Sequence, residues 1–159
     1  MSRIVVREVR SAAELEQAQA IRRAVFVAEQ GVAEALEIDG RDDAARHLLA
    51  LCDGRPSGTL RLRWLDGRRI AKIERVAVLA AARGQGIGQA LLRAALALAQ
   101  AQGGRAALLH AQTSAQAFYA RLGFVAGGAE FVEDGILHIA MRRALTAADR
   151  QGLGQRWAG

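Results

Sequence analysis

Arg83-Gly84-Gln85-Gly86-Ile87-Gly88 is a glycine-rich turn that joins a strand-like run, residues 69–79, to an alanine- and leucine-rich segment, residues 86–102. The apolar residues of that second segment recur at helical spacing, which predicts a helix. Glycines let backbone amides approach a ligand closely, and the start of a helix offers unpaired amide protons and the positive end of the helix dipole. The sequence therefore predicts an anion-binding site at this turn.

Two familiar kinds of phosphate-binding turn do not match these residues. A P-loop requires Gly-Lys-Ser/Thr at the start of the helix, whereas Gln89 and Ala90 follow Gly88. A dinucleotide-binding turn requires a further glycine three residues after Gly86, and an acidic residue about 20 residues later. Gln89 occupies the first of these positions, and the sequence contains no aspartate or glutamate between Glu74 and Glu130. Both kinds of site are therefore excluded.

The segments around the turn predict an α/β protein with a mixed sheet, which we interpret as a single domain over residues 1–159. A strand at residues 4–9 precedes a helix that begins with the capping pattern Ser11-x-x-Glu14. An acidic stretch up to Asp43 is expected to form a loop with one short helix. A strand–helix–strand crossover between Leu79 and Ala111 implies one parallel pair of strands. The other expected elements are a three-stranded antiparallel meander (residues 47–52, 58–65 and 69–79), a strand (106–111), a helix (114–122) and two closing strands (124–126 and 136–142).

Four segments resemble motifs of one known family. Arg83-x-x-Gly86-x-Gly88 resembles the Q/R-x-x-G-x-G/A signature of the GNAT N-acetyltransferases. Val76-Ala77-Val78 precedes the signature at the family's spacing, and Phe118-Tyr119-x-x-x-Gly123-Phe124 follows it. The segment Val25-Phe26-Val27-x-Glu29-Gln30-Gly31 looks like one bacterial subgroup of the family. The resemblance extends over the whole strand order and implies the GNAT fold, in which the fourth and fifth strands are parallel and splay apart.

The same resemblance implies that the chain binds acetyl-CoA. In the family, amides of the glycine turn hold the pyrophosphate, and the pantetheine arm lies against the fourth strand like an additional strand. Gln112 occupies a position where the family often has asparagine, and its longer side chain is expected to contact the cofactor in a similar way. The residues implied in cofactor binding are Val76, Ala77, Val78, Arg83, Gly84, Gln85, Gly86, Ile87, Gly88, Gln89, Gln112 and Ala115.

Acetyl transfer from a thioester requires a neutral amine, a donor for the oxyanion and a proton for the departing sulfur. The resemblance implies Tyr119 as the general acid, although a core aromatic on an amphipathic helix is the structural alternative. The backbone amide near Val78 is the implied oxyanion donor. Two residues remain open as the base: Glu74, acting through water on the fourth strand, and His110, because an unperturbed histidine side chain titrates near neutrality. The three histidines follow no metal-ligand spacing, so we expect no metal site.

The segment after the first helix is the expected acceptor site, with Phe26, Glu29 and Gln30 as substrate-binding residues. We hypothesise that Glu29, Glu37 and Asp39 attract a cationic amine, with a solvated acidic loop as the alternative. The implied reaction is direct transfer, in a ternary complex, to a primary amine of a small molecule or a peptide N-terminus. A non-catalytic acyl-CoA-binding regulatory protein of the same fold is the alternative function.

The composition bears on the remaining partners. The 159 residues carry a net charge of +6, but Lys72 is the only lysine, the arginines are scattered and aromatic residues make up only 4%. Nucleic-acid-binding surfaces concentrate positive charge and interleave it with aromatic side chains, so we expect no nucleic-acid partner. No apolar run approaches the ~20 residues of a membrane-spanning helix, so we expect no membrane partner.

The single cysteine, Cys52, excludes an internal disulfide. The first ten residues alternate apolar and charged side chains and lack the apolar core of a signal peptide. We therefore expect a reduced, cytoplasmic protein. The resemblance makes a homodimer possible, with residues 146–159 as a candidate part of the interface.

Overall fold

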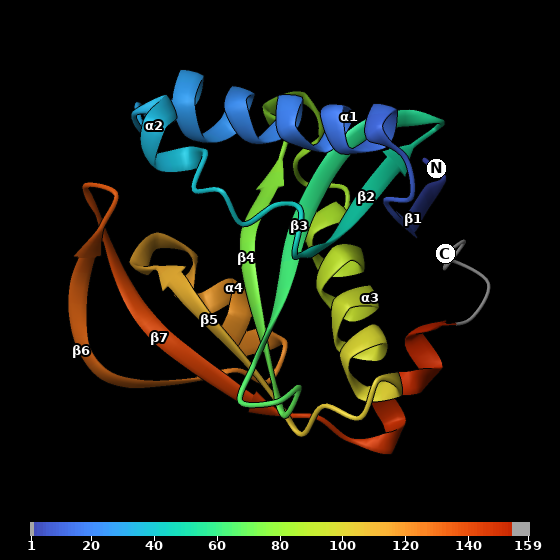
Figure 1. Cartoon of the computed structure of the whole chain (residues 1–159), viewed down its shortest axis with the longest axis vertical. Helices are drawn as coiled ribbons and strands as arrows, with labels where there is room; N and C mark the ends of the chain where they lie inside the picture. The colour runs from blue at the N-terminus through green and yellow to red at the C-terminus, as the bar shows by residue number, and fades with distance from the viewer. Residues whose placement is uncertain (1, 154–159) are drawn as a thin grey trace.

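The structure is a computed structural model that describes residues 2–153, and the side chains of residues 2–150. Its centre is a seven-stranded sheet in the order β1-β2-β3-β4-β5-β7-β6 (Figure 1). Among the described residues, β4 and β5 form the only parallel pair, which confirms the predicted mixed sheet. The strands are β1 (Ile4–Glu8), β2 (Arg46–Cys52), β3 (Arg55–Leu65), β4 (Ile70–Val78), β5 (Ala106–Gln112), β6 (Val125–Glu133) and β7 (Ile136–Ala144).

The helices begin and end where the local sequence dictates. Ser11 caps α1 (Ala12–Arg22) by accepting a hydrogen bond from the Glu14 amide at 3.1 Å, as the capping pattern predicts. The helix then continues without a break as a π-helix, η1 (Arg23–Glu29). The other helices are α2 (Glu34–Glu37), η2 (Ala80–Ala82), α3 (Ile87–Ala101), η3 (Thr113–Ala115), α4 (Gln116–Arg121) and η4 (Ala147–Leu153).

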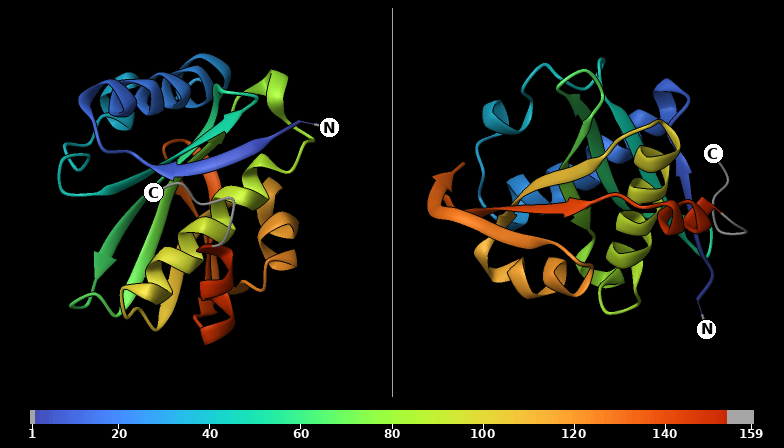
Figure 2. Two further views of the ribbon diagram at one scale, coloured as in Figure 1. Left: turned by 90° about the vertical axis from the view of Figure 1, so that its right-hand side faces the viewer. Right: turned by 90° about the horizontal axis from the view of Figure 1, so that it is seen from below.

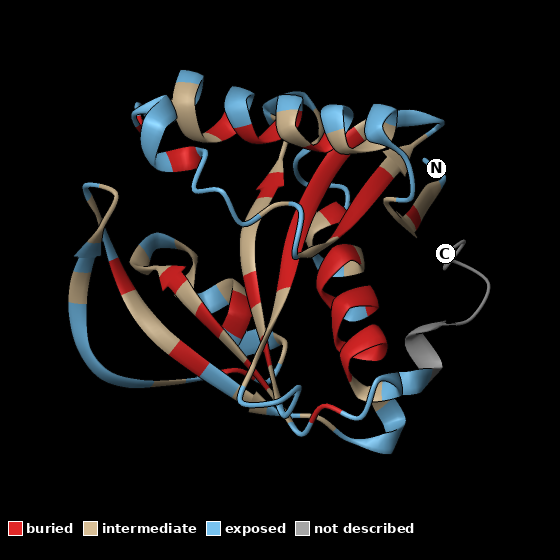
Figure 3. Cartoon of the chain, viewed as in Figure 1, coloured by how far each residue is buried: buried red, intermediate tan, exposed pale blue. Residues whose placement is uncertain are grey.

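Two apolar clusters lie on opposite faces of the sheet. Leu48 and Ala50 belong to the larger cluster, which includes the buried face of α3. Leu49 and Leu51 belong to the smaller cluster, with Ala18 and other residues of α1 and η1. Because successive side chains of a strand point to opposite faces, α1 and α3 cover opposite sides of the same strands. Figure 3 shows the buried side of α3 against them.

Three predictions of element bounds were wrong. The strand predicted at residues 124–126 is the nine-residue β6, because most of its side chains are exposed and therefore hide the alternation of a half-buried strand (Figure 3). The strand predicted at 58–65 begins three residues earlier, at Arg55, in spite of Pro56. The helix predicted at 114–122 is shorter, because its first turn is the 3₁₀ helix η3.

The chain after β7 folds back onto the molecule. The η4 helix packs against α3 (Figure 2), and Arg143 forms an ion pair with Asp149 at 2.9 Å. Residues 154–159, part of the candidate dimer interface, lie outside the described residues. Among the described residues, no helix is both long enough and apolar enough to cross a membrane.

Candidate active site

The sheet is open between β4 and β5. These strands pair from Ile70 and Ala106 up to Ile73 and Leu109, whereas β4 continues to Val78 and β5 to Gln112 without pairing to each other. Figure 1 shows the two strands diverging from that point. The predicted splaying of the fourth and fifth strands is therefore confirmed.

A bulge in β4 lies where the two strands separate. On its other edge, β4 pairs with β3, and the register shifts between the pairs Thr59–Ala77 and Arg61–Glu74. Arg75 lies inside this shift with φ of +55°, a strained value for a residue with a side chain. A bulge bends its strand and increases the local twist, so it turns the end of β4 away from β5.

The opening contains a cavity of about 310 Å³. Its walls come from η1, β4, β5, α4 and the β6–β7 hairpin, which are far apart in the sequence. Twelve of the residues predicted for the site line it: Phe26, Glu29, Gln30, Glu74, Val76, Ala77, Val78, Arg83, His110, Gln112, Ala115 and Tyr119.

The glycine turn lies beside this cavity and leads into α3. Gly86 is the N-cap residue of α3, has φ of +84° and caps the helix with no side chain. A Cβ added to Gly84 or Gly86 would meet nothing within 4 Å. The amides of Ile87, Gly88 and Gln89 in the first helical turn have no side-chain cap. Such a turn fits the pyrophosphate of a CoA molecule.

Arg83 connects this turn to η1. Its guanidinium donates hydrogen bonds of 2.6 and 2.7 Å to the two carboxylate oxygens of Glu29, and its Nε donates to the Val78 carbonyl at 3.1 Å. The hydrogen bond from Arg83 holds the pKa of Glu29 below its ordinary value. Next to this pair, Gln112 donates from Nε2 to Oε1 of Gln30 at 2.9 Å. The structure thus joins predicted cofactor-binding residues to predicted substrate-binding residues.

Tyr119 is buried in α4, with its ring edge-to-face against Phe118 and Phe124 at centroid distances of 5.0 and 6.0 Å. Tyr119 thus has the core packing of the structural alternative and also lines the cavity. Burial raises the pKa of Tyr119 to about 12. Its hydroxyl therefore stays protonated at neutral pH, as a proton donor requires.

Glu74 lies among cations. Arg63 donates to its carboxylate, and Arg61 and Lys72 lie 3.2 and 3.4 Å from it. Burial alone would raise the pKa of Glu74, but the Arg63 hydrogen bond and the neighbouring positive charges outweigh burial and lower it. A carboxylate held in its ionised form by three cations is a weak proton acceptor.

His110 lies on β5 with a carboxylate beside it. Its Nδ1 is 3.2 Å from Oε1 of Glu133, and its ring meets Phe131 edge-to-face at 5.0 Å. His138 lies in the same group, with Nε2 at 3.9 Å from Oε2 of Glu133. Within the part of the chain that the structure describes, no cluster of side chains could hold a metal ion.

Residues 11–145 match the family model described as an acetyltransferase (GNAT) domain. The chain belongs to the GNAT acetyltransferase family. YyaT of Bacillus subtilis (strain 168) is 34% identical over 144 residues, which cover 89% of this chain and 96% of YyaT. The crystal structure of an acyl-CoA N-acyltransferase from Pseudomonas aeruginosa is 36% identical, with a TM-score of 0.76 and coverage of 91% of this chain and all of that one. A CoA-dependent acyl-homoserine lactone synthase, BjaI, has a TM-score of 0.80 over 97% of this chain and 89% of its own, and at 20% identity shares the fold.

Sequence reasoning missed one wall of the cavity. Phe131, Glu133 and Asp134 received no role, although Glu133 and Asp134 line the cavity with His138. The strand predicted at residues 124–126 ended before all three residues. Phe131 and Glu133 alternate along the chain just before the turn Asp134-Gly135. This pattern was the signal in the sequence for a strand that continues up to the turn.

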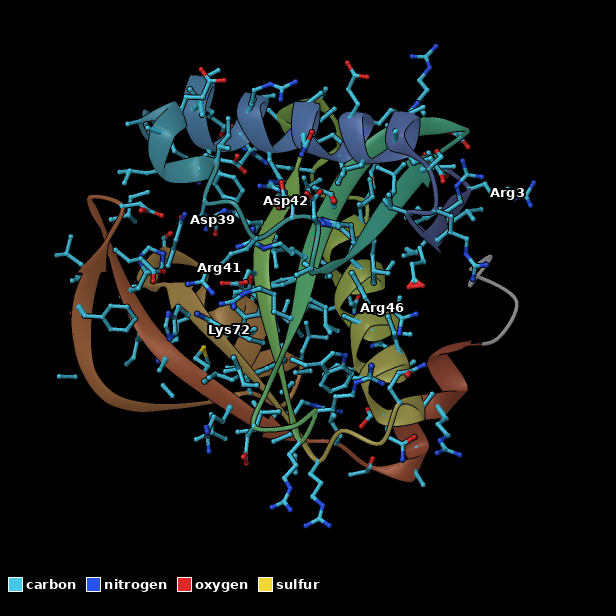
Figure 4. The ribbon with its side chains drawn as sticks, viewed as in Figure 1. Arg3, Asp39, Arg41, Asp42, Arg46 and Lys72 are labelled. Atoms are coloured by element: carbon cyan, nitrogen blue, oxygen red, sulfur yellow. The ribbon has the colours of Figure 1, made fainter. Side chains whose placement is uncertain are left out.

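The acidic loop does not present free negative charge to this GNAT site. Glu37 pairs with Arg22 and lies 3.8 Å from Arg75, and Asp39 pairs with Arg61 at 2.7 Å. Asp42 lies beneath α1 (Figure 4), where Gln19 and Arg22 donate hydrogen bonds to it. Because arginines neutralise these carboxylates, the arrangement argues against the hypothesis that Glu37 and Asp39 attract a cationic amine.

Proposed function

We propose that this GNAT family member is an N-acetyltransferase that transfers an acetyl group from acetyl-CoA directly to a primary amine of a small molecule or a peptide N-terminus. The observation that carries the proposal is the cavity between the unpaired ends of β4 and β5, which lies next to an uncapped glycine turn and contains Tyr119 and His110. A single opening then receives both substrates, which supports a ternary complex.

The residues present fit the donor substrate. The first-turn amides of α3 would hold the pyrophosphate, and the unpaired edge of β4 at Val76 and Val78 would bind the pantetheine arm as an additional strand. The backbone amide near Val78 would stabilise negative charge on the carbonyl oxygen. Acetyl-CoA supplies the activated acetyl group.

The cavity side chains account for every proton. Nε2 of His110 takes one proton from the acceptor ammonium, and the freed lone pair forms the N–C bond to the acetyl carbon. As the C–S bond breaks, Tyr119 gives its hydroxyl proton to the sulfur, and the second proton lost by the nitrogen restores the hydroxyl. His110 then releases its proton to solvent. The products are an amide, a free thiol and one proton.

Two carboxylates on the hairpin, Glu133 and Asp134, support an amine as the acceptor. Glu133 contacts histidines, and among the described residues Asp134 has no ion-pair partner. By contrast, Glu29 and Glu74, which also line the cavity, have arginine partners. Negative charge on the hairpin side of the cavity would favour an ammonium group there.

Two alternatives concern the donor and turnover. The acyl-homoserine lactone synthase BjaI was crystallised with isopentyl-CoA, so a longer acyl group is the alternative donor. A regulatory protein that binds acyl-CoA without turnover would not require Tyr119 and His110 in one cavity, and we therefore favour the enzyme.

The test is isothermal titration of the protein with acetyl-CoA, followed by an amine screen that measures thiol release. We expect micromolar binding that Gly86→Glu abolishes, because the new carboxylate would occupy the pyrophosphate position. The matched control is Gly67→Glu, which also has positive φ and open space around it but lies in the β3–β4 turn. Absence of binding in the parent protein would reject the proposed function. Tighter binding of a longer acyl-CoA would reject acetyl as the preferred group.

A further inference from the structure

We propose that Glu133 is the positioning residue of His110, holding its imidazole in the tautomer that can take a proton from the acceptor amine. The inference rests on the proposed function and assigns a role to the β6–β7 hairpin within it.

Strand register brings these side chains to one face of the sheet. His110 is paired with Ala140 and Gln112 with His138 across β5 and β7, so both histidines point to the same face. Phe131 on β6 is paired with His138 and shares that face, as does Glu133, two residues further along β6.

A bulge in β6 sets the position of Glu133. The pairing of β6 with β7 shifts between Gly127–Ala140 and Phe131–His138, so the three residues 128–130 lie opposite Ile139 alone. Because β6 has two more residues than β7 at this bulge, the alternation of its side chains between the two faces is unchanged. Each later residue of β6 is instead shifted by two positions relative to β7. Phe131 is therefore opposite His138, and Glu133 reaches Nδ1 of His110 at 3.2 Å.

The chemistry of this contact fixes the tautomer. An ionised carboxylate only accepts hydrogen bonds, so Nδ1 of His110 must carry the proton that lies between the two groups. In the neutral ring, Nε2 is then unprotonated and is the atom able to act as a base. No described residue bonds to Nε2, and His110 lines the cavity. The edge-to-face contact with Phe131 restricts rotation of the ring.

Other charged groups face the same space. Lys72 and Glu74 of β4 form an ion pair at 3.4 Å. The Tyr119 hydroxyl of α4 is uncharged at pH 7. On the hairpin, Asp134 lines the cavity. Nδ1 of His138 lies 2.7 Å from the Ile136 carbonyl, which can only accept a hydrogen bond, so this nitrogen carries the proton of the neutral ring. Nε2 of His138 would compete for Glu133 only when the His138 ring is doubly protonated. Glu133 is thus the carboxylate in direct contact with His110.

The first test follows the tautomer of His110 by nuclear magnetic resonance and needs no turnover. The protein has three histidines, and His110→Gln identifies the imidazole signals of His110. We expect the Nδ1-protonated form in the parent protein and a mixture of tautomers in Glu133→Gln, because an amide donates as readily as it accepts. The matched control, Glu130→Gln, removes the same charge from an exposed position on β6 and should leave the parent tautomer.

The second test measures kcat/KM for the best amine. We expect Glu133→Gln to lower kcat/KM roughly tenfold, because the imidazolium formed in the reaction loses its carboxylate partner. Glu130→Gln should leave kcat/KM unchanged, and Glu133→Gln should have no further effect in a His110→Gln background. An unchanged tautomer in Glu133→Gln would overturn the role of Glu133. A parent protein that shows the expected tautomer but releases no thiol with any amine would instead reject the proposed function.

Discussion

The hydroxyl of Tyr119 has no hydrogen-bond partner among residues 2–150, although its ring is buried against two phenylalanines. Removing this hydroxyl alone therefore separates its chemistry from its packing. We expect Tyr119→Phe to lower kcat roughly 10- to 100-fold and to leave the melting temperature almost unchanged. Steady-state kinetics and a thermal melt would measure both. Full activity in Tyr119→Phe would show that another group protonates the sulfur.

Some of the candidate site residues could be predicted from the sequence and others could not. The glycine turn and Tyr119 were predictable, because their signature is local and appears at fixed spacing. The environment of Glu74 was not predictable, since its three cationic neighbours include Arg61 and Arg63 on β3. Glu133 was missed because its place depends on a bulge, which the sequence of an exposed edge strand does not reveal.

At the scale of elements, the contact between α3 and the sheet depends on Gly58. A Cβ at this position in β3 would lie 2.9 Å from Cγ2 of Ile87 and 3.1 Å from the Ala77 carbonyl oxygen. Gly58→Ala would therefore push the start of α3 away from β3 and β4. We expect a loss of about 1–3 kcal/mol in the free energy of unfolding, together with weaker binding of acetyl-CoA, because the helix start forms the anion site.

Urea unfolding and calorimetric titration would measure these two effects. Gly127→Ala is the control, since its new methyl group would meet nothing within 4 Å and its φ is not positive. Equal stability of the two variants would contradict the importance of the Gly58 contact.

The helices and central strands were predictable because their apolar periodicity reflects burial on one or both sides. The π-helix η1 was not, because its residues continue the apolar pattern of α1 and its wider turn depends on packing. The acidic stretch contains the expected short helix, α2. Its carboxylates are not simply solvated, because Glu37 pairs with the buried Arg22 at the end of α1 and Asp39 with the buried Arg61 on β3.

At the scale of the whole molecule, these buried ion pairs link stability to pH. Burial alone would raise the pKa of Asp42, but hydrogen bonds from Arg22 and Gln19 lower it to about 2. The pKa of Asp39 is also lowered, chiefly by its hydrogen bond with Arg61. A carboxylate with a lowered folded-state pKa contributes stability above its unfolded pKa, near 4, and loses it as the pH falls through the folded pKa.

We therefore expect the melting temperature to fall as the pH is lowered from about 4 to about 2. Asp42→Asn should be less stable than the parent at pH 7 and should lose less stability over this acidic range. Thermal melts at several pH values would measure both. A parallel decline in the two proteins would show that Asp42 does not contribute to the acid sensitivity.

The divergence of β4 and β5 leaves two backbone edges facing each other inside the sheet, rather than at its rim. Exposed edges of this kind usually invite other chains to add a strand and aggregate. Here the walls of the cavity, including the Gln30–Gln112 contact between η1 and β5, narrow the access to these edges. The unpaired backbone edges can therefore pair with one narrow, extended ligand, while a strand from a neighbouring copy of the protein is kept from pairing with them.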